Sequence, residues 1–423
     1  MSPALLPFLK NMLIVLRGAV LGQGIVFLAL PWLSRLYDPQ DFGVMQSFQS
    51  LLSLLLILCS LRLEVAILRA SESELRHVVA ICVFLCLISS VVTLFVIVLL
   101  KWLTPTWFFG LSSVIWLLPA SLLLAGISQV CNYICLRRQA LGINADGKIA
   151  QSLTYVAVAG GVGLASPSAL ALNLADLLGR LALVLASWRG ALRQTLLDRA
   201  TLSRESLTVL SRFRSLPLFS MPSAAVNTLG SSFTPLMMLA LFGANEAGNF
   251  AMIERLLGTP IAVIAGAASQ AFMAAFSGQS LVANEKRVLF LRILRTSALL
   301  GFAPTIVLMA VGQDLLPLLL GDDWQLAGRY VGILAPMLYI SLLATPVNMT
   351  LVIGGHYGLQ FLWDSGRLVS LALMWWAISA GQYDSITAVS IYSAIVSIFY
   401  ILHIVLSYCC VNNGLGSNFF ERN

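Results

Sequence analysis

The chain of 423 residues contains twelve long apolar runs, separated by short connections that hold most of its charged residues. A helix needs about 20 mainly apolar residues to cross the hydrocarbon core of a bilayer, and these runs reach that length. Inside lipid the backbone must satisfy its own hydrogen bonds, which favours helices over an open sheet. The sequence predicts an all-α polytopic membrane protein with spans at residues 10–33, 43–62, 78–100, 111–136, 148–165, 168–188, 216–241, 247–276, 290–311, 328–353, 358–380 and 385–410.

The composition excludes a soluble globule. Hydrophobic residues make up 59% of the chain and charged residues only 10%, too few to solvate a surface of this size. The connections between the runs are short, so we expect no soluble domain on either side of the membrane. The first run is long and no small-residue cleavage site follows it, which indicates a span rather than a signal peptide.

Basic residues occupy alternate connections, and this pattern sets the orientation. The basic residues of the even connections are Arg62, Arg69, Arg76, Arg137, Arg138, Lys148, Arg189, Arg193, Arg199, Arg204, Arg212, Arg214, Lys286, Arg287, Arg292 and Arg295. Cytoplasmic loops are enriched in lysine and arginine, so both termini are predicted to be cytoplasmic. The net charge of +7 then reflects topology and contact with anionic lipid, and no nucleic-acid partner is expected.

The most basic connection, residues 189–215, divides the chain near its middle. It predicts an amphipathic helix lying on the cytoplasmic headgroups, and a simple topology anchor is the alternative interpretation. The predicted organisation is an N-terminal six-helix bundle over 1–188, a basic cytoplasmic linker over 189–215 and a C-terminal six-helix bundle over 216–423.

A weak internal repeat flanks this divider. Residues 36–43 and 241–248 share the pattern Leu-aromatic-three residues-acid-any-Gly, and Pro31 and Pro235 precede the two copies. Six spans separate the copies, so both halves insert with the same polarity. Parallel repeats of this kind predict two pseudo-symmetric six-helix bundles around a central cavity.

Signals of an enzyme or of a metal site are missing. The chain has no phosphate-binding glycine loop with lysine, no H-E-x-x-H and no G-x-S-x-G. Its three histidines are scattered, and the pairs Cys82/Cys86 and Cys131/Cys135 are expected to be buried apolar residues. We therefore predict no catalytic residue, no metal and no cofactor.

Four arginines fall inside apolar runs, where a charge is costly and normally faces a bundle interior or a watery cavity. The four candidate cavity cations are Arg17, Arg180, Arg255 and Arg367. Arg17 has no acid within its own span. Together with Arg255 it is the favoured anion-binding cation, and snorkelling towards the headgroups is the alternative for both.

Three acids accompany the other arginines. Asp176 lies at i,i+4 spacing from Arg180, so the two share a helical face and predict an ion pair. The i,i+3 spacing of Asp364 and Arg367 predicts another pair. Glu254 is adjacent in sequence to an arginine and so projects in a different direction. All three acids are candidate coupling or ion-pair groups.

Several segments resemble a known family. They are residues 31–43 (PWLSRLYDPQDFG), 61–67 (LRLEVAI), 241–243 and 247–250, followed by Arg255 and Pro260. These segments are similar to the Wzx-type flippases of polysaccharide biosynthesis, in the multidrug/oligosaccharidyl-lipid/polysaccharide exporter superfamily. Arg35, Asp41, Arg62 and Glu64 fall in the matching segments and are candidate gate or motif residues. For Arg62 and Glu64, together with Arg69, a packed ion cluster is favoured over a gate.

The resemblance implies two six-helix lobes that work by alternating access in a bacterial inner membrane. The implied substrate is an undecaprenyl-diphosphate-linked glycan, held at its diphosphate by cavity arginines in the positions of Arg17 and Arg255. Besides membrane lipids, the candidate partners are a polysaccharide polymerase and a chain-length regulator. The products served would be O-antigen, capsule or exopolysaccharide.

Three other functions are open on the sequence. A multidrug/cation antiporter of the same superfamily would need an acidic cavity, whereas the unpaired intramembrane charge here is basic. A membrane polysaccharide polymerase or ligase would need catalytic side chains on a large periplasmic loop, and the odd connections are short. A scaffold protein of the export machinery would not need cavity arginines.

Overall fold

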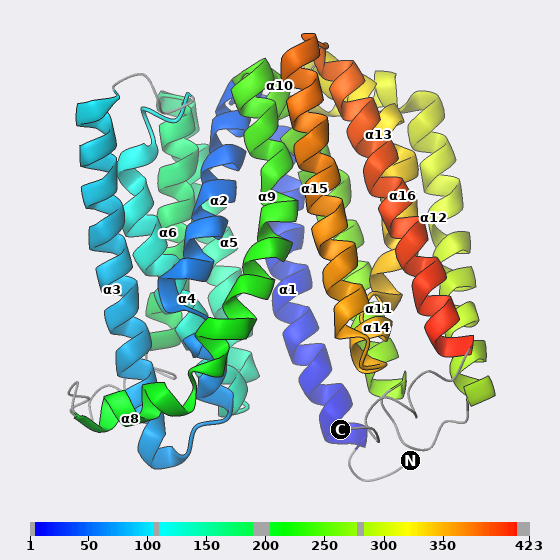
Figure 1. The fold of residues 1–423 in the computed structure, drawn as a ribbon. Coiled ribbons are helices and arrows are strands. Elements are labelled where there is room, and N and C mark those ends of the chain that lie inside the picture. The colour runs from blue at the N-terminus through cyan, green and yellow to red at the C-terminus, as the bar shows by residue number, and fades with distance from the viewer. Residues whose placement is uncertain (1–4, 105–109, 189–203, 277–282, 413–423) are drawn as a thin grey trace. The chain divides into compact units, whose positions relative to one another are not determined.

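A computed structural model describes residues 5–104, 110–188, 204–276 and 283–412 of the chain (Figure 1). Helices make up almost all of this part, and it contains no strand. Contacts group the chain into two compact units, Met1–Gly248 and Asn249–Asn423. Each unit is considered by itself below.

The first unit is built from long helices that pack side by side. Helix α5 contacts both α1 and α6, α4 contacts α3 and α6, and α9 lies along α2. The helices are α1 (Leu5–Leu33), α2 (Pro39–Ser60), η1 (Leu63–Leu68), α3 (Glu72–Leu103), η2 (Ile115–Leu117), α4 (Leu118–Arg137), α5 (Leu141–Ala165), α6 (Ala169–Ser187), α8 (Arg204–Arg212), η4 (Leu216–Ser220), α9 (Met221–Phe242) and the start of α10 (Ala244–Ile253).

In the second unit α13 contacts α12 and α16, and α15 packs on α16. The helices here are the end of α10, η5 (Glu254–Gly258), α11 (Thr259–Phe276), α12 (Ala283–Leu320), η6 (Asp322–Trp324), α13 (Gln325–Ala344), η7 (Thr345–Val347), α14 (Thr350–Ile353), α15 (Tyr357–Gly381) and α16 (Ser385–Asn412). The side chain of Asn249 accepts a hydrogen bond of 2.8 Å from the backbone amide of Ala327 and so caps the first turn of α13.

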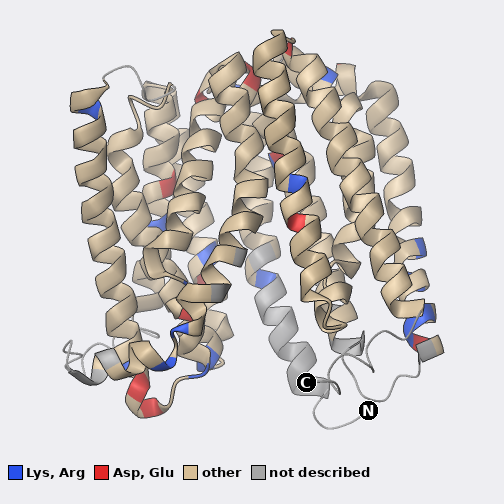
Figure 2. Ribbon diagram, in the orientation of Figure 1, with Lys and Arg blue, Asp and Glu red and all other residues tan. Residues whose placement is uncertain are grey.

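The predicted class, an all-α polytopic membrane protein, is confirmed. Among the described residues nine helical stretches are long and apolar enough to cross a membrane, and Val20–Leu33 is a shorter apolar helix. Charged residues lie mainly near the ends of the helices (Figure 2). The count of twelve spans, the pseudo-symmetry of two bundles and the cytoplasmic placement of both termini stay predictions.

The two copies of the repeat motif touch through their glycines. A Cβ atom on Gly43 would overlap the carbonyl oxygen of Ala244, and one on Gly248 would overlap that of Pro39. Only glycine permits backbones to approach this closely, as in small-residue contacts between membrane helices. In the first copy the hydroxyl of Tyr37 also donates a 2.6 Å hydrogen bond to the carbonyl of Ala159 in α5. The motif therefore has a packing role in the first unit.

Two prolines explain two wide helical turns. The amide of Met221 bonds the carbonyl of Leu216, and that of Thr259 bonds the carbonyl of Glu254, both at i→i−5 spacing. Pro222 and Pro260 come next, and proline can neither donate this bond nor accommodate the carbonyl of an ordinary turn. A π-type turn ahead of the ring resolves both problems.

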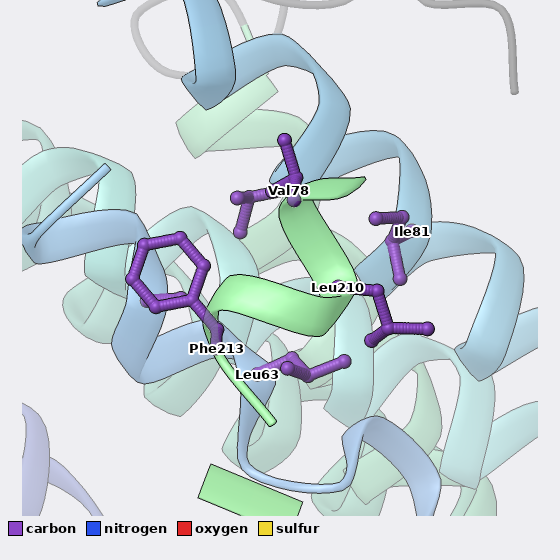
Figure 3. Close-up of a pocket in the computed structure, with 7 residues that line it drawn as sticks. Leu63, Val78, Ile81, Leu210 and Phe213 are labelled. Atoms are coloured by element: carbon purple, nitrogen blue, oxygen red, sulfur yellow. The ribbon is translucent and has the colours of Figure 1, made fainter. Parts of the chain in front are cut away.

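Helix α8 packs on the protein. Its apolar face contacts η1 and α3, and a small pocket there has only apolar lining residues: Leu63, Ala66, Val78, Ile81, Val209, Leu210 and Phe213 (Figure 3). Arg212 forms a 2.6 Å ion pair with Glu74 at the start of α3. The predicted amphipathic helix thus exists in part, but protein covers its apolar side. Residues 189–203 of the predicted linker lie outside the described residues.

Contacts divide the chain after Gly248, whereas the sequence predicted a division at residues 189–215. The difference arises because α9 packs along α2 and so joins the first unit by contact. Two six-helix bundles over 1–188 and 216–423 stay a prediction.

Candidate functional site

The crossing of α1 and α5 is held by small residues. A Cβ atom on Gly18 would lie 2.5 Å from the Cα of Ala145, so the two backbones are in direct contact. One turn later a Cβ on Gly22 would lie 3.2 Å from the hydroxyl of Ser152. Glycines four residues apart let membrane helices approach closely and fix their register. Residues next to this seam are therefore held at defined positions on both helices.

Arg17 and Asp146 flank the first of these contacts and form an ion pair. The Nη2 of Arg17 donates to the Oδ1 of Asp146 at 2.5 Å, and the two side chains are 52% and 66% exposed. Arg17 lies twelve residues into α1, about 18 Å along its axis. The prediction that its own span holds no acid is correct, but the neighbouring helix supplies one. Arg17 is thus paired to an acid, and protein leaves both side chains of the pair more than half exposed.

The predicted pair of Asp176 and Arg180 is confirmed within α6. The Nε of Arg180 donates to Oδ2 of Asp176 at 2.7 Å, and the side chains are 21% and 12% exposed. The i,i+4 spacing brings both onto one face, as the sequence indicated. Because protein covers most of the pair, it has the character of a structural pair.

The second predicted pair, Asp364 and Arg367, lies in a polar network between α15 and α16. Their closest approach is 3.9 Å, and Gln360 donates to Asp364 at 3.1 Å. The guanidinium of Arg367 also lies 4.9 Å from the ring centre of Trp363. The ring of His403, in α16, forms a 3.3 Å hydrogen bond with the side-chain oxygen of Gln360. The pairing of Arg367 is confirmed, and it includes an aromatic face that the sequence did not indicate.

Glu254 and Arg255 lie in the wide π-type turn η5, and both side chains are partly buried. Adjacent in sequence, they attract each other electrostatically. A π-type turn inside a longer helix often marks a functional position. Roles for Arg255 in anion binding and for Glu254 in coupling stay predictions.

The motif residues Arg35 and Asp41 are not brought together into a site. Arg35 is exposed in the turn between α1 and α2. Asp41 is partly buried in the first turn of α2. An acid in the first turn of a helix suits the helix dipole. This position gives Asp41 a structural role, and a gate role for either residue stays a prediction.

The expected ion cluster at Arg62 and Glu64 is wrong in its partners. Within the described residues Glu64 is fully buried and accepts hydrogen bonds from the neutral side chains of Ser60 and Gln129, with no ion pair to Arg62. Leu61 and Arg62 adopt left-handed backbone angles, φ 51° and 62°. This backbone turn ends α2 and directs the Glu64 side chain to Ser60 and Gln129 instead of Arg62.

Sequence reasoning missed two residues. Asp146 was assigned to a connection because the fifth span was placed from 148, but α5 already begins at Leu141. The sequence did hold a signal for Asp146: an intramembrane arginine needs an acid, and Asp146 is the only acid between the fourth and fifth predicted spans. Arg137 was taken as a topology marker, yet it donates to the carbonyls of Ile67 and Ala70 at 2.6 and 2.5 Å.

The described residues contain no cluster of three or more His, Cys, Asp or Glu side chains suited to a metal ion. The predicted burial of Cys82, Cys86, Cys131 and Cys135 is confirmed. The apolar pocket under α8 offers no group that could bind a sugar or a phosphate. The chemistry available inside the helices is ionic: arginines paired to carboxylates, at different levels of exposure.

Long apolar helices with arginine–carboxylate pairs in their bodies define a class, the polytopic helical membrane proteins. The fold is similar to that of a multidrug resistance MATE family transporter of the MOP superfamily in its inward-facing conformation, with a TM-score of 0.69, 15% identity and 96% of each chain covered. It is also similar to the lipid II flippase MurJ, with a TM-score of 0.70, 10% identity and coverage of 96% of this chain and 90% of that one. A MOP superfamily transporter from Pyrococcus furiosus gives a TM-score of 0.62 at 15% identity, with 96% of each chain covered.

The chain belongs to the polysaccharide biosynthesis protein family, whose model matches residues 32–328. The resemblance seen in the sequence is therefore confirmed, and the protein is a multi-pass inner-membrane protein of a transporter fold. A curated relative is the teichuronic acid biosynthesis protein TuaB of Bacillus subtilis (strain 168), 26% identical over 186 residues. That match covers 44% of this chain and 38% of TuaB.

Proposed function

We propose that this protein is a flippase that moves an undecaprenyl-diphosphate-linked oligosaccharide from the cytoplasmic to the periplasmic leaflet by alternating access. The observation that carries the proposal is Arg17, a cation well inside the apolar helix α1 whose side chain is 52% exposed. Family membership and the similarity to the fold of MurJ, a lipid II flippase, support a lipid-linked substrate. The teichuronic acid function of TuaB supports a role in surface glycan synthesis.

The physical need for such a protein follows from the substrate. A diphosphate and its sugars cannot cross hydrocarbon alone, because their charges and hydroxyls would lose water without replacement partners. Arginine offers a planar set of donors that fits phosphate oxygens. We assign Arg17 and Arg255 to the diphosphate, while the prenyl chain stays in lipid. The lobes that rock would be residues 1–188 and 216–423.

Arg180 and Arg367 have a secondary place in this proposal. Their side chains are only 21% and 13% exposed, and each has a carboxylate on its own helix. Removing such an arginine would strand a buried acid, so we assign these pairs to the stability of the helices. Their acids, with Glu254, stay candidates for ion coupling.

A multidrug/cation antiporter is the second candidate function, favoured by the similarity to MATE transporter folds. In an antiporter the acids, rather than the arginines, would bind the transported cation. The two functions are separable, because neutralising Arg17 should abolish glycan export but leave the extrusion of cationic drugs intact.

The test is complementation of a strain that lacks the gene. Arg17→Ala and Arg255→Ala, singly and together, should abolish surface polysaccharide while membrane insertion stays at the wild-type level. Arg76→Ala is the matched control, since Arg76 is an exposed arginine near the start of α3 and outside the candidate site. Full surface polysaccharide in the double variant would refute the assignment of the diphosphate to these arginines.

A second measurement separates flipping from polymerisation or ligation. In the deletion strain, lipid-linked repeat units should accumulate on the cytoplasmic face, where externally added glycosidase cannot reach them in intact spheroplasts. Accumulation of single repeat units on the periplasmic face would point to a polymerase or ligase. Co-purification with a polymerase or a chain-length regulator would test the proposed partners.

A further inference from the structure

The ion pair of Arg17 and Asp146 joins two helices at a fixed point. Gly18 and Ala145 are the next residues along each helix, and their backbones are in direct contact. This contact fixes the separation of the helices beside the pair. The carboxylate of Asp146 is therefore presented to Arg17 by the scaffold, and it returns to the same place whenever it is released.

Exposure distinguishes this pair from the others inside the helices. Its side chains are 52% and 66% exposed, whereas those of Asp176 and Arg180 are 12% and 21% exposed. In the water-filled cavity that the proposed function requires, an exposed ion pair contributes little, because both ions regain solvent when they separate. Opening the Arg17–Asp146 pair leaves no buried charge behind, so a ligand can take the place of Asp146 at low cost.

The contact also leaves much of the guanidinium available. Within the described residues Arg17 makes one hydrogen bond, from Nη2 to one oxygen of Asp146. A guanidinium carries five N–H donors in a planar fork. A diphosphate brings more negative charge than a carboxylate and several oxygens that can accept two parallel bonds. In competition for Arg17 the diphosphate should therefore displace the carboxylate.

From these observations we infer that Asp146 is a resident counter-anion, which occupies Arg17 in the absence of substrate and is displaced from it by a prenyl diphosphate. The inference rests on the proposed function. In the empty protein Asp146 balances the charge of Arg17, and as an exposed partner it holds that arginine only weakly. The same carboxylate competes with the bound diphosphate and so favours its release. Asp146 is a positioning residue that sets affinity through Arg17.

The test measures binding of farnesyl diphosphate to the full-length protein in lipid nanodiscs. Asp146→Asn removes the competing charge and keeps the shape of the side chain, so the Kd should fall about threefold to fivefold, the factor that corresponds to an exposed ion pair. Asp146→Ser should act in the same direction. Asp38→Asn is the matched control: it removes an equal charge from an exposed acid beyond the far end of α1 and should leave the Kd unchanged.

The second arm places Asp146→Asn in an Arg17→Ala background. There the substitution should have no effect on Kd, because the residue acts through Arg17. An unchanged or raised Kd for Asp146→Asn, or an equal gain with and without Arg17, would overturn the inference while leaving the flippase proposal standing. Absence of farnesyl diphosphate binding to the wild-type protein, together with full surface polysaccharide in Arg17→Ala cells, would reject both.

Discussion

Two ion pairs of the first unit show how the same chemistry serves different purposes. Asp176 and Arg180 lie on one helix, 2.7 Å apart and mostly covered by protein. Arg17 and Asp146 come from two helices, 2.5 Å apart and more than half exposed. The covered pair cannot separate without leaving a charge in a poorly solvated place, so it belongs to the fold. Protein does not cover the open pair in this way, and this difference is why we propose Arg17 for the diphosphate.

The largest expected effect concerns the covered pair. Asp176→Asn leaves Arg180 without its counter-ion and should lower the free energy of unfolding by about 3 kcal/mol. Denaturant unfolding in detergent would measure this loss. The double variant Asp176→Leu/Arg180→Met removes both charges and should recover most of the stability. A loss below about 1 kcal/mol for Asp176→Asn would place this pair in the same class as the exposed one.

The next effect tests whether the helix crossing supports the open pair. Gly18→Val places carbons where the backbone of Ala145 lies and should cost about 2 kcal/mol by overpacking. It should also separate Arg17 from Asp146 and reduce surface polysaccharide. Gly24→Ala on the same helix is the control, since nothing lies within 4 Å of the added carbon. Equal stability of the two variants would show that the crossing is loose.

Removal of the open pair itself should matter little for stability. Arg17→Ala and Asp146→Ala should each change the free energy of unfolding by less than about 1 kcal/mol, since exposed ion pairs contribute no more. Thermal unfolding of the purified variants would measure this, beside the surface polysaccharide assay. Severe unfolding of Arg17→Ala would assign the loss of export to stability and weaken the substrate-binding interpretation.

The smallest effect is the response to salt. The coupling energy of Arg17 and Asp146, measured by a double-mutant cycle, should be about 0.5 kcal/mol at low salt and vanish near 1 M, where the screening length is about 3 Å. The coupling of Asp176 and Arg180 should persist, because protein shields it from ions. Equal salt sensitivity of the two couplings would contradict the difference in exposure.

Local spacing predicted part of the site correctly. The pairs Asp176–Arg180 and Asp364–Arg367 follow from helical periodicity, which places residues three or four apart on one face. The ion cluster expected at Arg62 and Glu64 did not form, because the left-handed residues Leu61 and Arg62 end the helix there and redirect the chain. Pairing by periodicity holds only where the helix is continuous.

The contacts of Arg17 and of α8 could not be predicted in this way. Asp146 lies 129 residues from Arg17 in the chain, and no local pattern relates them. The apolar face of α8 was expected to meet lipid, and amphipathic periodicity alone does not say whether lipid or protein covers such a face. Its partners, η1 and α3, become apparent only once the chain has folded.

The sequence by itself determined the helical membrane class and the family, because apolar run length and short motifs are local properties. It also determined which arginines would be costly, since that depends only on their place within an apolar run. Tertiary structure alone decided which of these arginines are covered and which are open, and it brought Asp146 to Arg17. Exposure and pairing between helices arise from packing, and packing joins residues that the sequence keeps far apart.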